Sequence, residues 1–208
     1  MTARHPGRPP AYPDPDAHLL ALLRAGDEQA FVLLVRRYRP SMLRLAAAYV
    51  PSRAVAEEVV QDAWLGFLRG LNRFEGRSSV RTWLFRILVN RARSARSKEL
   101  RSTAVADLSA TVDAARFDAS GGWASPPQCW TDLVDDRLVA QQMADAVAVA
   151  MGDLPDRQRA VVTLRDVEGL SSQEVCSVLE ITEANQRVLL HRGRSRLRQL
   201  LESQFGGA

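Results

Sequence analysis

The sequence predicts an all-α protein of two small helical domains joined by a flexible linker. Apolar residues recur at helical spacing through most of the 208 residues, and no run of alternating apolar and polar residues indicates a strand. Between residues 101 and 132 the helical pattern stops, and Ala, Asp, Ser, Gly and Pro dominate. Trp123 and Trp130 are unusual in such a linker, and they either dock on another surface or pack on the chain's own domains.

The helical segments on either side of the linker give the domain boundaries. Residues 1–15 are rich in proline and are expected to form a disordered tail that buries nothing. Residues 16–100 then form the first domain, and residues 133–208 form the second.

Four helices are expected in the first domain, beginning near residues 18, 27, 52 and 80, with the last ending near Leu100. Pro40 lies inside the second run of apolar residues and should kink that helix or mark a boundary. Ser52 is a suitable N-cap for the third helix, because its side-chain oxygen can accept a hydrogen bond from the first turn.

The third helix has an acidic face. Val59, Val60, Ala63 and Phe67 share one side of it, which leaves Glu58, Gln61 and Asp62 on the other. A stripe of this kind is most often a solvated surface, and docking on a partner protein is the alternative.

Aromatic residues and arginines alternate in the segment that follows, from Phe74 through Trp83 and Phe85 to Arg96. Unpaired DNA suits this pattern, because an expelled base needs a stacking platform and its backbone needs cations. Each of the three aromatic residues could equally belong to the core.

The second domain is expected to be a four-helix module with a helix-turn-helix. Its helices cover about residues 133–152, 156–167, 172–179 and 183–205, with Ser171 or Ser172 capping the third. The last two have the spacing of a helix-turn-helix, held by Val175, Val178, Leu179 and Ile181. On the last helix Leu190, Leu197 and Leu201 are expected to face the core, and Arg187, Val188, His191, Arg192, Ser195 and Arg198 to form a cationic face.

Arg187 and Arg192 are the strongest candidates for reading DNA. A recognition helix needs free polar N-terminal turns to enter the major groove, with arginines nearby to hold the phosphates. Val188 could contact a thymine methyl group or pack internally.

Composition agrees with a polyanionic partner without proving one. The formal net charge is +4, and every cation except Lys98 is arginine, although the codon usage of a GC-rich genome would give the same bias. Cys129 and Cys176 lack partners at metal-ligand spacing, so neither a metal nor another cofactor is expected. The start of the chain is no signal peptide and no segment is long and apolar enough for a membrane, so a cytoplasmic location is expected.

Two stretches, residues 27–101 and 154–201, together resemble the extracytoplasmic-function (ECF) sigma factors of RNA polymerase. The motifs that carry the resemblance are EEVVQD at 57–62, RFEG at 73–76, RTWL at 81–84, LPDRQR at 154–159, VEGLS at 167–171 and LHRGR at 190–194. Asn185 to Leu189 depart from the pattern common in the family, so the -35 sequence cannot be transferred from relatives.

The resemblance implies a division of labour between the two domains. The resemblance implies that the acidic helix docks on the β′ clamp helices of core RNA polymerase, which is expected to involve Glu57, Glu58, Gln61 and Asp62. Recognition and melting of the -10 promoter element falls on Arg73, Phe74, Arg77, Ser78, Arg81, Trp83, Arg86, Asn90 and Arg93. Recognition of the -35 element falls on Ser172, Asn185, Arg187, Val188, His191 and Arg192 of a domain that rests on the β flap. The resemblance also implies a linker that threads toward the active centre, and an anti-sigma factor is a further partner to consider.

Two other classes remain as alternatives. One is a helix-turn-helix regulator that does not act as a polymerase subunit, and a stable complex with core polymerase would distinguish the sigma factor from it. The other is a nuclease using Glu57 and Glu58 or Asp135 and Asp136, but these carboxylates lack a histidine cluster, a glycine-rich phosphate loop or any metal signature. We therefore expect no catalytic residues.

Overall fold

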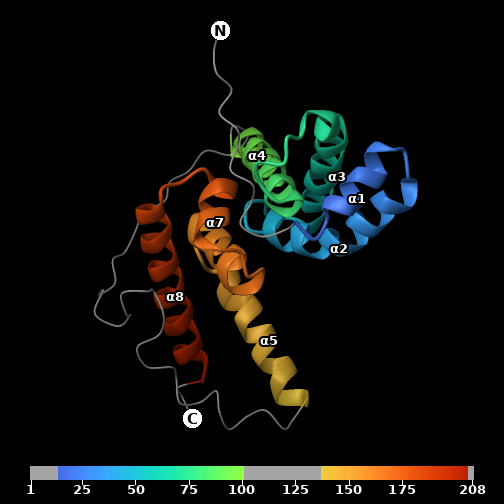
Figure 1. Ribbon diagram of the computed structural model, residues 1–208. Helices are drawn as coiled ribbons and strands as arrows, with labels where there is room; N and C mark the ends of the chain where they lie inside the picture. Colours follow the sequence, from blue (N-terminus) through green and yellow to red (C-terminus); the bar gives the residue numbers. More distant parts are fainter. Residues whose placement is uncertain (1–13, 101–136, 206–208) are drawn as a thin grey trace. The chain divides into compact units, whose positions relative to one another are not determined.

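The computed structural model describes residues 14–100 and 137–205, which form two compact units, and each unit is described by itself (Figure 1). No strand occurs within these two ranges. The first unit holds α1 (Ala17–Arg24), α2 (Glu28–Ala46), α3 (Arg53–Gly70), the short 3-10 helix η1 (Leu71–Arg73) and α4 (Val80–Leu100). The expectations for Trp123, Trp130, Cys129, Asp135 and Asp136 fall outside the described residues.

Side-chain caps fix where the helices of the first unit begin. Asp27 accepts hydrogen bonds from the backbone N–H groups of Gln29 (2.8 Å) and Ala30 (3.3 Å) at the start of α2. Ser52 accepts one from the backbone of Val55 (3.2 Å) at the start of α3, as the sequence predicts.

The core of the first unit lies where α4 packs against α3 and α2. Large apolar side chains with no exposed surface fill it, and each stabilises the fold by about 1.5–3 kcal/mol when fully buried. Phe85 is one of them, which resolves the alternatives left open for this ring in favour of the core. The others of this size are Leu34, Met42, Leu45, Phe67, Leu84 and Leu88.

Pro40 does not interrupt α2, which continues from Glu28 to Ala46. Of the two predicted alternatives, a kink or a boundary, the boundary is therefore wrong. The physical reason is packing, because Leu34, Tyr38, Met42 and Leu45 form a buried stripe on both sides of the proline, while Pro40 itself is exposed. Tertiary burial thus outweighs the loss of one backbone donor.

A buried carboxylate joins the start of the first unit to α2. The side chain of Asp16 has no exposed surface and accepts hydrogen bonds from Tyr38 and from Arg37, with which it forms an ion pair. Burial, followed by the hydrogen bond to Asp16, raises the pKa of Tyr38 above its ordinary value. Asp16 therefore anchors the N-terminal end of this unit in its core.

The second unit consists of α5 (Arg137–Gly152), α6 (Asp156–Val162), the π-helical turn η4 (Thr163–Val167), α7 (Ser172–Leu179) and α8 (Glu183–Phe205). The sequence predicts one continuous helix from 156 to 167, but its last turn widens, with the Glu168 N–H donating to the carbonyl of Thr163 (2.9 Å). Gly169, at φ +67°, then reverses the chain into the segment before α7.

Gly193 allows α8 to approach α6 closely. A Cβ atom at this position would lie 2.7 Å from Cγ2 of Val162, which is shorter than any normal carbon contact. The same side of α8 buries Gln186, Leu190 and Gly193. Ser195 is also buried, with 7% of its surface exposed, so its predicted place on the cationic face is wrong.

Candidate functional site

Three exposed side chains form the acidic face of α3. Glu58, Gln61 and Asp62 are exposed, while Ala56, Val59, Val60, Ala63 and Phe67 are buried on the other side of the helix. Glu57 differs from its neighbours because it is half-buried and forms an ion pair with Arg53 at 3.1 Å. We use the name acidic face for Glu58, Gln61 and Asp62.

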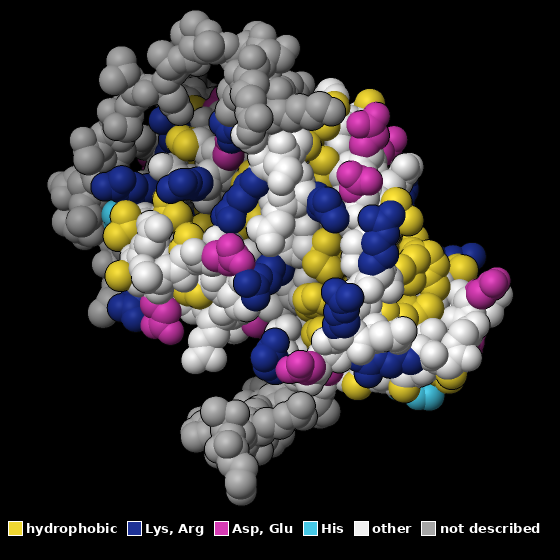
Figure 2. Space-filling model, turned by 90° about the horizontal axis from the view of Figure 1, so that it is seen from above, with side chains coloured by type: hydrophobic (Ala, Val, Ile, Leu, Met, Phe, Trp, Pro, Cys, Tyr) yellow, Lys and Arg dark blue, Asp and Glu magenta, His cyan; other side chains and the backbone are white. Residues whose placement is uncertain are grey.

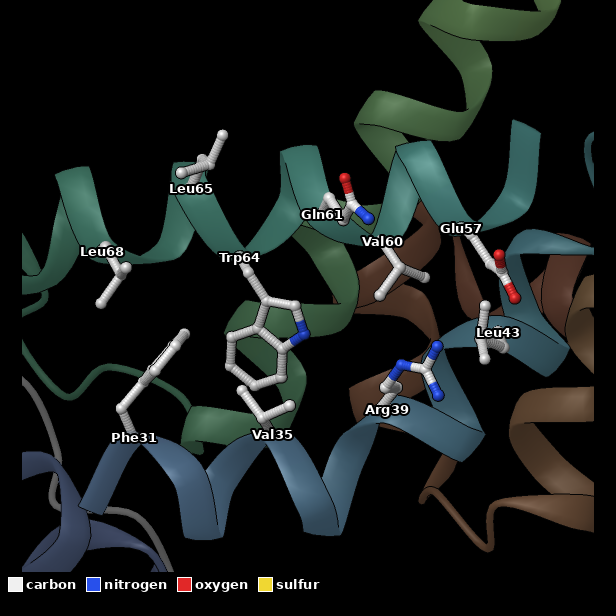
Figure 3. A pocket seen from close by; sticks show the side chains of 10 residues that line it. All are labelled: Phe31, Val35, Arg39, Leu43, Glu57, Val60, Gln61, Trp64, Leu65 and Leu68. Carbon is white, nitrogen blue, oxygen red and sulfur yellow. The ribbon is translucent and has the colours of Figure 1, made fainter. Parts of the chain in front are cut away.

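A groove of about 470 Å³ runs between α2 and α3 beside the acidic face (Figure 3). Trp64 of α3 points toward Phe31 and Val35 of α2 and meets the Phe31 ring edge to face, with centroids 5.4 Å apart. Arg39 and Glu57 lie toward one end of the groove in the same view. The complete lining is Phe31, Val35, Arg39, Leu43, Glu57, Val60, Gln61, Trp64, Leu65 and Leu68.

The sequence reasoning missed this groove, although a signal was present. Leu65 and Leu68 are 48% and 38% exposed, and they continue the line of the acidic face along α3 at helical spacing. Large apolar residues on an otherwise polar helix face indicate a surface that another protein can cover. Acidic and apolar groups therefore lie next to each other on one side of α3.

Three aromatic rings pack in a row where the loop between η1 and α4 meets α3 and α4. Phe74 stacks on Trp83 with centroids 4.5 Å apart and planes 20° apart, and Trp83 packs on Phe67 at 4.8 Å. Phe67 is buried, while Trp83 and Phe74 are half-buried. Gly70 makes room for the indole, since a Cβ there would lie 2.9 Å from its Cζ2 atom. We call this arrangement the aromatic stack.

The polar residues predicted near this stack occupy two kinds of position. Those that are exposed on the loop and on α4 are Arg73, Arg77, Arg86 and Asn90, and those that are half-buried are Ser78, Arg81 and Arg93. Arg77 pairs with Glu75 (3.3 Å) beside Gly76, whose φ of +70° allows the loop to turn. Arg86, Asn90 and Arg93 recur at the spacing of one face of α4. The loop and one side of α4 thus combine cations with a stacking platform.

A capping box sets the start of the helix-turn-helix. The hydroxyl of Ser171 accepts a hydrogen bond from the backbone of Glu174 (3.2 Å), and the Glu174 carboxylate accepts one from the backbone of Ser171 (2.9 Å). Of the predicted clamp residues, Val175, Val178 and Leu179 are buried and Ile181 is half-buried. Thr182 then caps α8 by accepting a hydrogen bond from the backbone of Asn185 (3.3 Å).

The candidate readers on α8 differ in accessibility. Asn185, Arg187, Val188 and Arg192 are exposed in the first three turns, and His191 is half-buried. Arg187 pairs with Glu183 one turn earlier at 3.3 Å, and this exposed pair stabilises the helix by at most about 0.5 kcal/mol. A ligand phosphate or base can therefore displace Glu183 at little cost.

Ser172 is engaged inside the unit. It is half-buried, and its hydroxyl donates to Oε1 of Gln186 (3.0 Å), which is only 2% exposed. This contact joins the first turn of α7 to the first turn of α8 and helps to fix the angle between them. Sequence reasoning missed Gln186, because glutamine is rarely placed in a core without a visible partner.

Charge is dispersed over the face of the molecule seen in Figure 2, where arginines are spread among apolar side chains.

Among residues 14–100 and 137–205, no three His, Cys, Asp or Glu side chains are placed to hold a metal ion. Burial raises the pKa of the Cys176 thiol above its ordinary value. Within the same ranges, no helix is long and apolar enough to cross a membrane.

Comparisons with known proteins match both units. The model of Sigma-70 region 2 matches residues 34–102, and that of Sigma-70, region 4 matches residues 144–197. The ECF RNA polymerase sigma-E factor of Escherichia coli (strain K12) is 30% identical over 179 residues, which cover 86% of this chain and 90% of the relative. The sigma-E factor of Haemophilus influenzae is 27% identical over 187 residues, covering 90% of this chain and 95% of the relative.

Two solved structures share the fold. The structure of CnrH in complex with the cytosolic domain of CnrY has a TM-score of 0.60 at 23% identity, covering 90% of this chain and 97% of that one. The sigma factor RpoE in complex with the anti-sigma factor NepR from Bartonella quintana has a TM-score of 0.58 at 22% identity, covering 83% and 96%.

The two family models, in this order on one chain, define a sigma-70-type transcription factor with regions 2 and 4. Within that class the chain belongs to the ECF RNA polymerase sigma factors, and it is an alternative sigma factor for transcription initiation. The alternative of a helix-turn-helix regulator that is not a polymerase subunit finds no support in these comparisons.

Proposed function

We propose that the acidic face and the adjacent groove dock this sigma factor on core RNA polymerase, that the loop and α4 open the -10 element, and that α8 reads the -35 element. The observation that carries the proposal is the match of region 2 and region 4 to the two units that present these surfaces. The protein then acts in the cytoplasm by binding, with no catalytic step of its own.

The docking surface joins charge to apolar area. Glu58 and Asp62 provide the charge that selects a basic partner surface, and the groove with Leu65 and Leu68 provides area to bury. The resemblance to the family assigns this surface to the β′ clamp helices. The resemblance likewise assigns contact with the β flap to the second unit.

Charge reversal tests the docking surface. Like charges that meet across an interface cost several kcal/mol, so Glu58→Arg or Asp62→Arg should weaken binding to core polymerase by about a hundredfold or more. The isosteric pair Glu58→Gln with Asp62→Asn separates charge from shape, and Glu28→Arg on α2 is a control of equal charge change. Fluorescence anisotropy of labelled sigma titrated with core polymerase measures the affinities. Unchanged affinity in both reversal variants would exclude this face.

The loop and α4 are proposed to hold the melted -10 strand. The aromatic stack offers Phe74 as an outer ring on which an unpaired base can stack, and Trp83 supports it from behind. Arg73, Arg77, Arg81, Arg86 and Arg93 supply cations for the backbone, while Ser78 and Asn90 supply hydrogen bonds.

On α8, Arg187 and Arg192 are proposed to contact bases or phosphates, with Asn185, Val188 and His191 around them, and Ser172 positions the helix through Gln186. Alanine at a base-reading arginine should cost about 1–3 kcal/mol on duplex -35 DNA and relax sequence preference. Arg196→Ala, at an exposed position further along α8, is the matched control. If Arg187→Ala and Arg192→Ala both bind as the unaltered protein does, α8 is not the reading helix.

An anti-sigma factor is proposed as a further partner, because a sigma factor of like fold has been solved together with one.

Reconstitution of transcription tests the proposed sigma-factor function as a whole. The chain added to core polymerase should start transcription at defined promoters, and neither component alone should do so.

A further inference from the structure

We infer that Arg24 and Asp14 are positioning residues for promoter opening, because they hold the two ends of the loop between η1 and α4 in place from outside it. This inference rests on the proposed role of that loop in binding the -10 element. Neither residue belongs to the segments that resemble the family motifs, and Asp14 lies in the stretch that the sequence predicts to be tail.

Arg24 ties down the N-terminal end of the loop. From the last turn of α1, its guanidinium donates to the carbonyl oxygen of Leu71 through Nε (3.2 Å) and Nη2 (3.0 Å). The same Nη2 also donates to the carbonyl oxygen of Phe74 (2.5 Å). Arg24 therefore spans η1 and fixes the backbone of the residue whose ring forms the outer face of the aromatic stack.

Asp14 ties down the C-terminal end. One oxygen of its carboxylate accepts a hydrogen bond from the backbone N–H of Val80, the first residue of α4, at 2.7 Å. Within the same turn Ser79 accepts a hydrogen bond from the backbone of Thr82 (3.1 Å). A carboxylate at this end of a helix interacts favourably with its dipole, so Asp14 stabilises α4 where the loop enters it.

The segment that carries Asp14 is itself anchored. The second oxygen of Asp14 accepts the backbone N–H of Asp16 (3.1 Å), and the buried Asp16 carboxylate binds Tyr38 and Arg37 on α2. The position of α4 is thus connected to the core by a chain of hydrogen bonds. Between the two fixed ends, Glu75, Gly76 and Arg77 remain exposed.

Fixing the ends of a loop before DNA arrives reduces the entropy lost when a base is captured. It also sets the register in which Arg73, Phe74 and Arg77 meet the strand. Loss of either tie should therefore blur discrimination between -10 sequences, and this effect differs from a uniform loss of active protein.

Holoenzyme reconstituted with core polymerase tests the inference. The probes are two fluorescent promoter duplexes, one with the -10 sequence of a promoter mapped from its transcript and one with a single base of that element replaced. A matched base typically gives about 5- to 150-fold discrimination. The measured quantity is the ratio of the rates of open-complex formation on the two probes, which does not change with the fraction of folded protein.

We expect Arg24→Ala and Asp14→Ala to lose most of this discrimination. Arg24→Lys should lose it too, because a flexible ammonium lacks the rigid planar fork with which the guanidinium holds both carbonyls from Nε and Nη2. Asp14→Asn keeps an acceptor for the Val80 N–H and should retain the ratio. Arg36→Ala, at an exposed arginine on α2, is the matched control and should leave the ratio unchanged.

Other outcomes overturn the inference. Equal slowing of both probes by Arg24→Ala, with Arg24→Lys behaving as the unaltered protein, would make Arg24 a phosphate contact. If Arg24→Ala, Arg24→Lys and Asp14→Ala all slow open-complex formation equally on both probes, the hydrogen bonds of Arg24 and Asp14 only stabilise the fold. Phe74→Ala and Arg77→Ala separate this failure from that of the proposed function, because if they too leave the ratio unchanged the loop does not read the -10 element.

Discussion

Gly193→Ala should destabilise the second unit, because α8 passes α6 with no room for a side chain. The added Cβ would lie 2.7 Å from Cγ2 of Val162 and 3.4 Å from Cβ of Gln158. Optimal carbon contacts are about 3.5–4.0 Å. The methyl of Val162 or the axis of α8 must therefore move by about 1 Å.

Two effects of opposite sign determine how much Gly193→Ala changes the free energy of unfolding. Alanine favours a helix over glycine by about 1 kcal/mol, while overpacking a core costs about 1–3 kcal/mol. Relief is limited, since Val162 is only 2% exposed and the carbonyl oxygen of Gln158 would lie 3.5 Å from the new atom. The net expectation is a loss of about 1–2 kcal/mol in the free energy of unfolding of this unit.

Hydrogen exchange read by mass spectrometry suits the measurement, because peptides of α6 and α8 report on the second unit separately from the first. Gly152→Ala is the matched control, since nothing lies within 4 Å of a Cβ at that position, and it should cause no loss. Val162→Ala removes the methyl groups that the new Cβ meets. Its effect and that of Gly193→Ala should fall short of additivity in the double variant, and additivity within about 0.5 kcal/mol would refute the reasoning.

Three further predictions concern the two units. Phe74→Ala should weaken binding of holoenzyme to single-stranded -10 DNA by about 1–3 kcal/mol in anisotropy titrations, while its binding to duplex -35 DNA stays unchanged. Tyr38 should stay protonated in absorbance titrations at 295 nm as the pH rises above 10, because its pKa in the folded chain is raised. The stability that this shift contributes is complete below the unfolded pKa of tyrosine and is lost as the pH rises through the folded pKa. Tyr38→Phe should therefore lose less stability at alkaline pH than the unaltered protein does. Ser172→Ala should lower stability by about 0.5–1.5 kcal/mol in urea titrations and weaken discrimination between -35 sequences, because its hydroxyl bonds Gln186 and so helps to position α8.

Much of the fold could be predicted from periodicity and capping. The limits of α4 and the cap at Ser52 agree with the structure, because these features depend on residues within one turn of each other. The π-helical turn at the end of α6 could not be predicted. There the backbone N–H of Leu170 donates to the carbonyl of Leu164 and both residues are buried, an arrangement that no local sequence pattern records.

Exposure on single helices was equally predictable, and contacts between distant segments were not. Glu58, Gln61 and Asp62 are exposed as the helical spacing of their apolar neighbours indicates. The groove depends on Phe31 and Val35 meeting Trp64 from another helix, and the tie from Arg24 spans 47 residues to Leu71. Ser195 was misplaced because the buried side of α8, which also holds Gln186, Leu190 and Gly193, is wider than the spacing of its leucines indicates.

Because Asp14 and Asp16 are anchored to α2 and α4, the part of the chain that folds as the first unit begins earlier than the part that the family model matches. The region 2 match begins at residue 34, inside α2, whereas the carboxylates that stabilise α2 and α4 lie about twenty residues earlier. A fragment cut at the family boundary would lose α1, the cap of α4 and the partner of Tyr38 together. Shortening or tagging the chain close to Asp14 would therefore alter the loop between η1 and α4, the proposed -10 reader, which lies more than fifty residues away in the sequence.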